Sequence, residues 1–207
     1  MSGFTTHSGK IAVLNEDQVD TDRIIPARFL SKVEKSGYGE LLFNDVRKDG
    51  FVLDTPEAKD ASILVVGTNF GCGSSREHAV WAIQQGGFQC VIARKEDTSP
   101  GYSDIFRGNA ANCGLLLIEL NPTDHAVLAA RPTGSEVTVD LPNQTLAFEG
   151  HRFSFEINEA TKLALIAGLD LIGTTMQYEP DITAFEASST SFVPDTMEIT
   201  HAEITHA

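Results

Sequence analysis

The sequence is poor in cysteine. Its 207 residues include three, Cys72, Cys90 and Cys113, an odd number spaced too widely for a disulfide framework or a paired-cysteine zinc site. We therefore expect reduced thiols. The same spacing argues against a four-iron cluster held by this chain alone, because such clusters take three or four thiolates, usually two of them close in sequence.

Long hydrophobic runs are also lacking. No stretch approaches the roughly eighteen consecutive apolar residues that a membrane-spanning helix needs. Residues 1–10 do not show the basic-then-apolar order of a secretory signal. Together with the reduced thiols, these absences predict a cytoplasmic protein without a membrane partner.

Basic residues are few: 15 Lys and Arg stand against 29 Asp and Glu, for a formal net charge of -14. This balance excludes nucleic acid and anionic membranes as expected partners, because both require a basic surface. A small anionic substrate remains possible if Arg side chains or helix N-termini gather at one point, since salt screens charges beyond roughly 8 Å. With 42% hydrophobic residues the chain has enough apolar side chains to form a core.

The hydrophobic patterns predict an α/β fold. Three apolar runs of strand length alternate with two helical patterns between residues 61 and 120, which is typical of a parallel βαβαβ core with right-handed crossovers. The expected elements are strands at 62–67, 88–93 and 115–120, and helices at about 75–85 and 102–112.

Further strands and helices are expected on both sides of this core. We predict an N-terminal strand at 9–14, helices at 122–130 and 158–167, and antiparallel strands at 136–140, 145–148 and 152–157. The expected domain covers residues 1–180. Within it, the long irregular segment 31–56 is interpreted as a mobile flap, and residues 181–207 are interpreted as a weakly ordered tail.

The glycine-rich segment 67–79 lies between the first core strand and its helix. Ligands of parallel α/β sheets bind outside the carboxyl ends of the strands, and a glycine-rich turn lets backbone N–H groups face an anion. The spacing excludes a P-loop, a dinucleotide fingerprint and the nucleophile elbow of serine hydrolases. A carboxylate or phosphate site is the interpretation that remains.

Two readings of this segment stay open. Ser74 and Glu77 have capping-box spacing, so Ser74 is either a simple helix cap or a functional residue. Arg76 in the first helical turn would oppose the helix dipole at a cost of about 0.3–1 kcal/mol. A bound carboxylate would compensate for this, as would a salt bridge to Glu77 or to a neighbouring loop acid. We interpret His78 as structural and Cys72 as a small residue in a tight turn.

Residues 69–79 have the sequence NFGCGSSREHA, which resembles the signature of the swivelling domain in the aconitase superfamily. Segments 20–30, 39–45 and 103–109 extend the match to the small subunits of 3-isopropylmalate dehydratase. The resemblance covers most of residues 7–180 and implies a swivelling β/β/α domain. It also implies a hydro-lyase of leucine biosynthesis, which dehydrates 2-isopropylmalate to isopropylmaleate and rehydrates it to 3-isopropylmalate.

The resemblance further implies a partner and residue roles. A large subunit would carry a 4Fe-4S cluster, and this chain would be active only together with it. Ser74 would be the base that removes and returns the C–H proton, while Ser75 and Arg76 would bind a substrate carboxylate. Metal ligands are not expected in this chain.

The same resemblance implies that substrate choice depends on residues 27–38. Arg28, Phe29 and Leu30 would bind substrate, with Phe29, Leu30 and Val33 lining an isopropyl-sized pocket. The alternative is that these apolar side chains fasten the flap to the core. Two other functions stay open: a small subunit acting on homoaconitate, citramalate or a similar hydroxy acid, and a non-catalytic anion-binding module.

Overall fold

The computed structural model describes residues 3–31, 34–73 and 76–188. The chain divides into two compact units, Met1–Asp170 and Leu171–Ala207, and each is considered by itself. The contact boundary at residue 170 lies ten residues before the predicted domain end at 180. That domain boundary stays a prediction.

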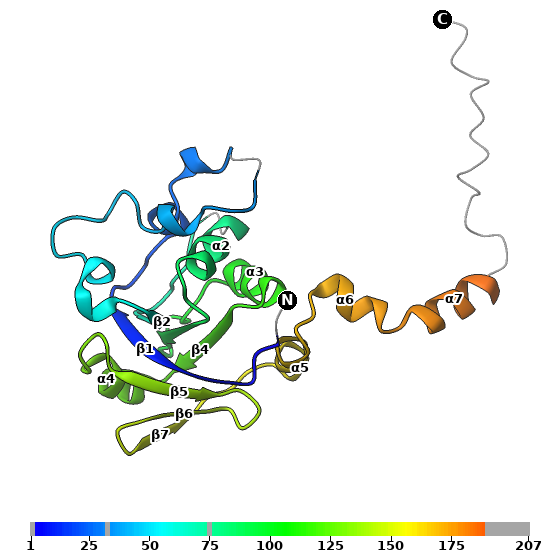
Figure 1. Cartoon of the computed structure of the whole chain (residues 1–207). Coiled ribbons are helices and arrows are strands. Elements are labelled where there is room, and N and C mark those ends of the chain that lie inside the picture. The colour runs from blue at the N-terminus through cyan, green and yellow to red at the C-terminus, as the bar shows by residue number, and fades with distance from the viewer. Residues whose placement is uncertain (1–2, 32–33, 74–75, 189–207) are drawn as a thin grey trace, which may run out of the picture. The chain divides into compact units, whose positions relative to one another are not determined.

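The first unit is built on one mixed seven-stranded sheet (Figure 1). Its order is β4-β3-β2-β1-β5-β6-β7, with parallel pairing from β4 to β1 and antiparallel pairing from β1 to β7. The strands are β1 Thr6–Leu14, β2 Ala61–Val66, β3 Cys90–Arg94, β4 Leu116–Leu120, β5 Glu136–Asp140, β6 Thr145–Phe148 and β7 His151–Ser154. The predicted α/β class, with a parallel βαβαβ core and added antiparallel strands, is confirmed.

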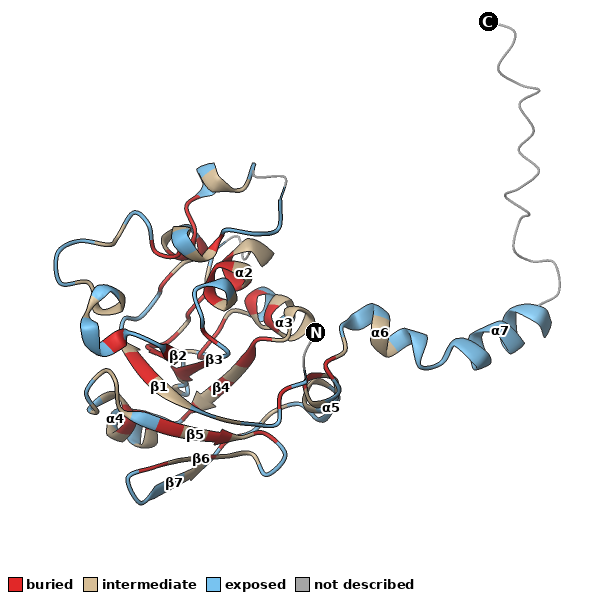
Figure 2. Ribbon diagram, viewed as in Figure 1, coloured by how far each residue is buried: buried red, intermediate tan, exposed pale blue. Residues whose placement is uncertain are grey.

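Helices cover both faces of the sheet because its central strands are apolar on both sides. In β2, Leu64 and Val66 pack with α2 (Glu77–Gln85) and α3 (Asp104–Cys113) in one core cluster. Ile63 and Val65 belong to a second cluster, which includes residues of α4 (Pro122–Ala129) and α5 (Glu159–Ala167). Figure 2 shows this buried centre along the strands. The parallel half of the sheet thereby becomes a rigid support for the loops at its strand ends.

Helix ends follow the sequence signals closely. Asn158 caps α5 by accepting a hydrogen bond from Thr161 N at 3.2 Å, and α5 stops at Gly168 in the left-handed conformation. Gly114 ends α3 in the same way, with φ of 81°. Both glycines lie within two residues of the helix ends predicted at 112 and 167.

The segment expected to be a flap contains no long helix or strand among its described residues. After α1 (Thr21–Ile24), the chain forms short 3₁₀ turns at Ala27–Phe29, Gly39–Leu41, Val52–Asp54 and Pro56–Ala58. Tyr38, Leu42 and Phe43 are fully buried in the α2 face of the core. The middle of this segment is therefore anchored, and motion of the rest stays a prediction.

The second unit begins with two helices, α6 (Leu171–Met176) and α7 (Glu179–Ser188). They expose large apolar side chains, including Ile172 and Phe185. The predicted weakly ordered tail begins inside α7, and residues 189–207 lie outside the described part of the chain. Among the described residues, no helix has the length and apolar character required to span a membrane.

Candidate functional site

The glycine-rich loop leaves the carboxyl end of β2 and is held from two sides. On one side, Gly71 N donates to Val19 O at 2.8 Å and Thr21 N donates to Cys72 O at 3.0 Å. On the other, Phe70 N donates to Gly101 O at 2.8 Å. Three segments distant in sequence thus meet at one end of the parallel sheet, as the strand-end rule predicts.

Two glycines of this loop are required by its shape. Gly71 has φ of 73°, and a Cβ there would lie 2.3 Å from Cγ of Phe106. A Cβ on Gly67 would lie 2.1 Å from Oδ1 of Asp17. Both values are far inside van der Waals contact, so the glycines allow neighbouring groups to pack directly against the loop backbone.

Asp17 joins the start of the loop to the end of β3. Its Oδ1 accepts a hydrogen bond from Thr68 N at 2.8 Å, and Arg94 Nη2 contacts Oδ1 and Oδ2 at 2.9 and 2.8 Å. The Thr68 hydrogen bond, helped by the Arg94 charge, holds the pKa of Asp17 below its usual value although partial burial opposes this. The carboxylate is therefore ionised at neutral pH.

His125 supports the same strand end from α4. It is buried, and its Nε2 lies 2.7 Å from Val66 O, the last carbonyl of β2. Donation from Nε2 satisfies this carbonyl at the point where the chain leaves the strand. Burial lowers the pKa of His125, so the neutral imidazole is favoured.

Acidification from pH 7 to pH 5 is expected to destabilise the fold partly through His125. Because its pKa is lowered in the folded chain, the unfolded chain binds more protons below about pH 6.5, and stability falls as the pH falls through this range. His125→Gln retains a donor for Val66 O and should flatten this loss. The loss of stability is measured as the difference between the guanidinium unfolding midpoints at the two pH values. An equal loss of stability in His125→Gln and in the wild type would contradict the prediction.

Arg76 is placed differently from the sequence prediction. Helix α2 begins at Glu77, and Arg76 occupies the N-cap with no side-chain cap hydrogen bond. The open reading with Ser74 at the N-cap and Glu77 at the third helical position does not fit this helix start. Glu77 at the first helical position instead accepts from Cys113 Sγ at 3.3 Å. Burial, followed by this contact, raises the pKa of Cys113. This contact ties Glu77 to α3.

The guanidinium of Arg76 pairs with a neighbouring loop acid, one of the alternatives left open by the sequence. Its Nη1 lies 2.6 Å from Oδ1 of Asp22, and the two side chains are 28% and 57% exposed. The pair is thus accessible to a solute and is not an internal ion pair. Ser74 and Ser75 precede it directly in sequence but lie outside the described residues.

The residues expected to bind substrate after α1 have partners of their own. Arg28 donates to Asp45 and, at 3.2 Å, to Asn44, and its guanidinium lies 4.4 Å from the centre of the Phe29 ring. The Arg28 hydrogen bond lowers the pKa of Asp45. Phe29 and Leu30 pack against the core cluster, which supports the fastening alternative. Val33 lies outside the described residues.

The other residues singled out in the loop have structural surroundings. The His78 ring lies 4.6 Å from Trp81 and 5.5 Å from Tyr38, measured between centroids, so its predicted packing role is confirmed. Asp17, Arg94 and His125 were missed by the sequence analysis. Their position at strand ends could have indicated two of them, because Asp17 follows the first strand and Arg94 ends the second core strand.

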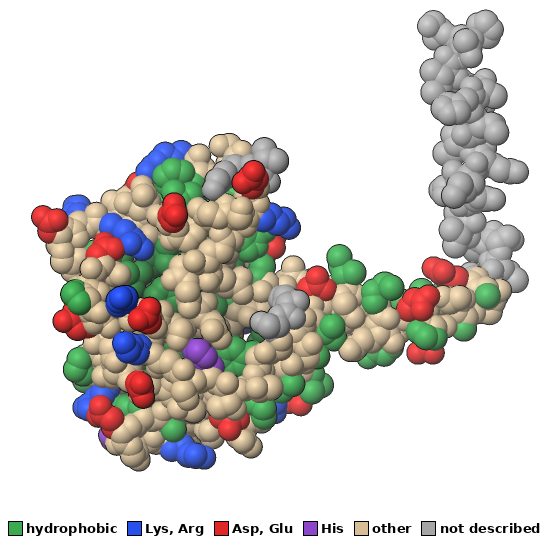
Figure 3. Space-filling view, viewed as in Figure 1, with side chains coloured by type: hydrophobic (Ala, Val, Ile, Leu, Met, Phe, Trp, Pro, Cys, Tyr) green, Lys and Arg blue, Asp and Glu red, His purple; other side chains and the backbone are tan. Residues whose placement is uncertain are grey.

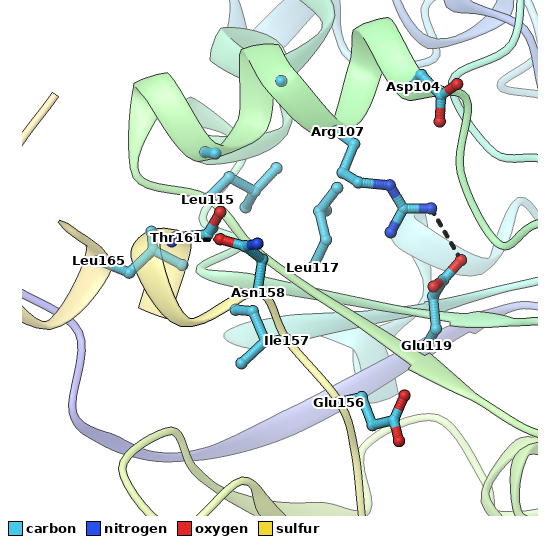
Figure 4. Close-up of a pocket in the computed structure, with 12 residues that line it drawn as sticks. Asp104, Arg107, Leu115, Leu117, Glu119, Glu156, Ile157, Asn158, Thr161 and Leu165 are labelled. Carbon is cyan, nitrogen blue, oxygen red and sulfur yellow. Dashed lines mark hydrogen bonds and ion pairs between the residues drawn. The ribbon is translucent and has the colours of Figure 1, made fainter. Parts of the chain in front are cut away.

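A cavity of about 610 Å³ lies elsewhere, between α3, β4 and the start of α5 (Figure 4). Leu115, Leu117 and Ile157 contribute apolar walls, and Arg107 contacts Glu119 at 3.0 Å on one side. None of its lining residues belongs to segment 67–76. This cavity therefore does not coincide with the described part of the candidate loop.

No metal centre is formed by the described residues: they contain no group of three or more His, Cys, Asp or Glu side chains arranged to hold an ion. Cys90 is buried and Cys72 is partly buried. The face of the first unit seen in Figure 3 has acidic and basic side chains interspersed. A local guanidinium such as Arg76 is thus the kind of feature that an anionic ligand would need on this acidic chain.

Comparison with known proteins matches residues 1–123 to the aconitase C-terminal domain family. The 3-isopropylmalate dehydratase small subunit of Oenococcus oeni is 46% identical over 93% of this chain and 100% of its own. That of Streptomyces coelicolor is 44% identical over 96% of this chain and 100% of its own.

The chain belongs to the 3-isopropylmalate dehydratase small-subunit family. The family resemblance seen in the motifs is thereby confirmed. The fold of this small subunit agrees with the crystal structure of a 3-isopropylmalate dehydratase protein from Methanocaldococcus jannaschii, at a TM-score of 0.64 and 28% identity. The match covers 86% of this chain and 98% of that one. Segment 67–79 lies within the part of this small subunit that matches the aconitase C-terminal domain family.

Proposed function

We propose that this small subunit joins a large cluster-bearing subunit in the cytoplasm and isomerises 2-isopropylmalate and 3-isopropylmalate through isopropylmaleate. The observation that carries the proposal is the accessible Arg76 guanidinium at the N-terminus of α2, beside a loop fixed by backbone hydrogen bonds. The relatives named as small subunits support both the reaction and the need for a partner.

Arg76 is proposed to bind one substrate carboxylate. Asp22 occupies the guanidinium from one side through a single 2.6 Å contact, and a guanidinium has five N–H donors. A carboxylate can therefore bind the remaining donors or displace Asp22. The first turn of α2 adds N–H groups without intrahelical partners, which favour an anion at the same place.

Ser74 is proposed as the base that exchanges the substrate C–H proton, and Ser75 as a second carboxylate contact. A serine hydroxyl is a poor base, so the alkoxide must be stabilised when the proton leaves. Arg76 and the helix-end amides are the positive groups next to it in sequence, and they would act most strongly with water excluded. The assembled interface would supply that exclusion.

The hydroxyl group that leaves the substrate needs an electrophile. A 4Fe-4S cluster in the large subunit would supply a Lewis acid for it. This chain would contribute carboxylate binding and proton transfer. Arg28, Phe29 and Leu30 are proposed to set substrate choice indirectly, by fixing the shape of the segment that follows them.

Reconstitution tests the function. The full chain is mixed under anaerobic conditions with a cluster-bearing large subunit, and interconversion of the two isopropylmalates is measured. We expect activity only when both chains are present. Homoaconitate and citramalate are compared as substrates, and preferential turnover of either would contradict the proposed specificity. Carboxylate binding by the chain alone, with no gain of activity on mixing, would indicate a non-catalytic module instead.

A further inference from the structure

We infer that Asp17 and Arg94 are positioning residues that set the placement of the loop ending at Arg76. This inference rests on the proposed function, and it adds two residues that neither touch the proposed substrate nor belong to the matched loop. Asp17 lies in the turn after β1, and Arg94 is the last residue of β3. Together they join three neighbouring strand ends.

The contact between them and the loop is direct. The Asp17 carboxylate accepts the Thr68 N–H at 2.8 Å and receives Arg94 Nη2 on both of its oxygens, at 2.8 and 2.9 Å. Arg94 also donates its backbone N–H to Gly67 O at 3.3 Å. The Asp17 side chain and the Arg94 backbone thus bind the two ends of the peptide that links Gly67 and Thr68.

Each partner is itself fixed. Arg94 Nε donates to Glu96 at 2.8 Å, and the Arg94 side chain is only 22% exposed. The turn that holds Asp17 is tied to the loop by Gln18 N, which donates to Thr68 O at 2.9 Å. Thr68 is 4% exposed. The N–H and C=O of Thr68 are therefore both hydrogen-bonded to the turn after β1.

Close packing couples the carboxylate to the loop backbone. The position of a Cβ on Gly67 would fall 2.1 Å from Asp17 Oδ1, so the carboxylate sits directly against the Gly67 Cα. Removing it leaves the Thr68 N–H without its acceptor and a space beside Gly67. The loop can then shift toward that space, and a misplacement of about 1 Å at a reacting centre can cost on the order of 100-fold in rate.

The test compares Asp17→Ala with Asp17→Asn in the assembled enzyme. Alanine removes the acceptor and the charge, whereas asparagine keeps an acceptor for Thr68 N–H. We expect kcat/KM to fall roughly 10- to 100-fold for alanine and about threefold for asparagine. Assays are run at temperatures well below the midpoint of thermal unfolding. There, replacing a residue that only stabilises the fold would leave kcat/KM unchanged. The control is Glu16→Gln, one residue away, whose carboxylate pairs with Arg23; it should stay within about twofold of the wild type.

Amide hydrogen exchange on the full chain gives a second readout that needs neither partner nor activity. Asp17→Ala should accelerate exchange at Thr68 roughly tenfold and leave the β2 amides at their wild-type rates. Unchanged exchange at Thr68, or a kcat/KM for Asp17→Ala equal to that of Glu16→Gln, would overturn the inference. A wild-type complex without isomerase activity would contradict the proposed function, while the exchange result would still decide the role of Asp17.

Discussion

Ser74→Ala in the assembled enzyme is expected to lower kcat by a factor on the order of 10²–10⁴, the range that a positioned general base contributes. The substrate C–H proton would then have no acceptor on this chain, while Arg76 and the helix terminus would still bind the carboxylate. KM should therefore change much less than kcat. Steady-state kinetics on both isopropylmalates measure the two constants.

Association of the two subunits serves as the internal control for this variant. Sedimentation or size-exclusion chromatography should show the same complex for Ser74→Ala as for the wild type. A matched variant, Ser8→Ala, removes an exposed hydroxyl that hydrogen-bonds Thr138 on the antiparallel side of the sheet, and it should retain full activity. If Ser74→Ala turned over at the rate of Ser8→Ala, Ser74 would have no part in the reaction.

Gly71→Ala should strongly destabilise the folded chain. A Cβ at residue 71 would lie 2.3 Å from the ring of Phe106, and the backbone φ is 73°. Overpacking costs about 1–3 kcal/mol, and a left-handed conformation costs a non-glycine residue about 1–2 kcal/mol. The combined loss of roughly 3 kcal/mol should lower Tm by about 10 °C in a chain of this size. Calorimetry or thermal circular dichroism measures the shift.

Gly108→Ala is the matched control, because it adds the same methyl group without either penalty. Gly108 lies inside α3, and a Cβ there would have no neighbouring atom within 4 Å. Alanine is favoured over glycine in a helix by up to about 1 kcal/mol, so Tm should rise slightly or stay unchanged. Equal Tm values for the two variants would show that the loop tolerates a side chain at residue 71.

The fold was largely predictable because its core signals are local. The apolar run of β2 and the glycines that follow α3 and α5, Gly114 and Gly168, each act within a few residues. The start of α2 was not predictable in the same way. Ser74 and Glu77 have capping-box spacing, yet tertiary contacts hold Arg76 in an extended conformation and draw Glu77 toward Cys113.

The site was predictable in its position and only partly in its contacts. The strand-end rule and the motif located the loop and Arg76. The Arg76–Asp22 and Asp17–Arg94 pairs join residues 54 and 77 positions apart, and no local pattern specifies such partners. The roles of Ser74, Ser75, Arg28, Phe29 and Leu30 stay predictions.

The segment with the family signature depends on other parts of the chain for its conformation. Backbone hydrogen bonds join it to Val19, to Gly101 and to Thr21 at the start of α1, all supplied by other parts of the chain. Grafting residues 67–79 alone onto an unrelated α/β scaffold would transfer the side chains and lose their arrangement. Any transplant or redesign of this chemistry has to move the ends of three strands together.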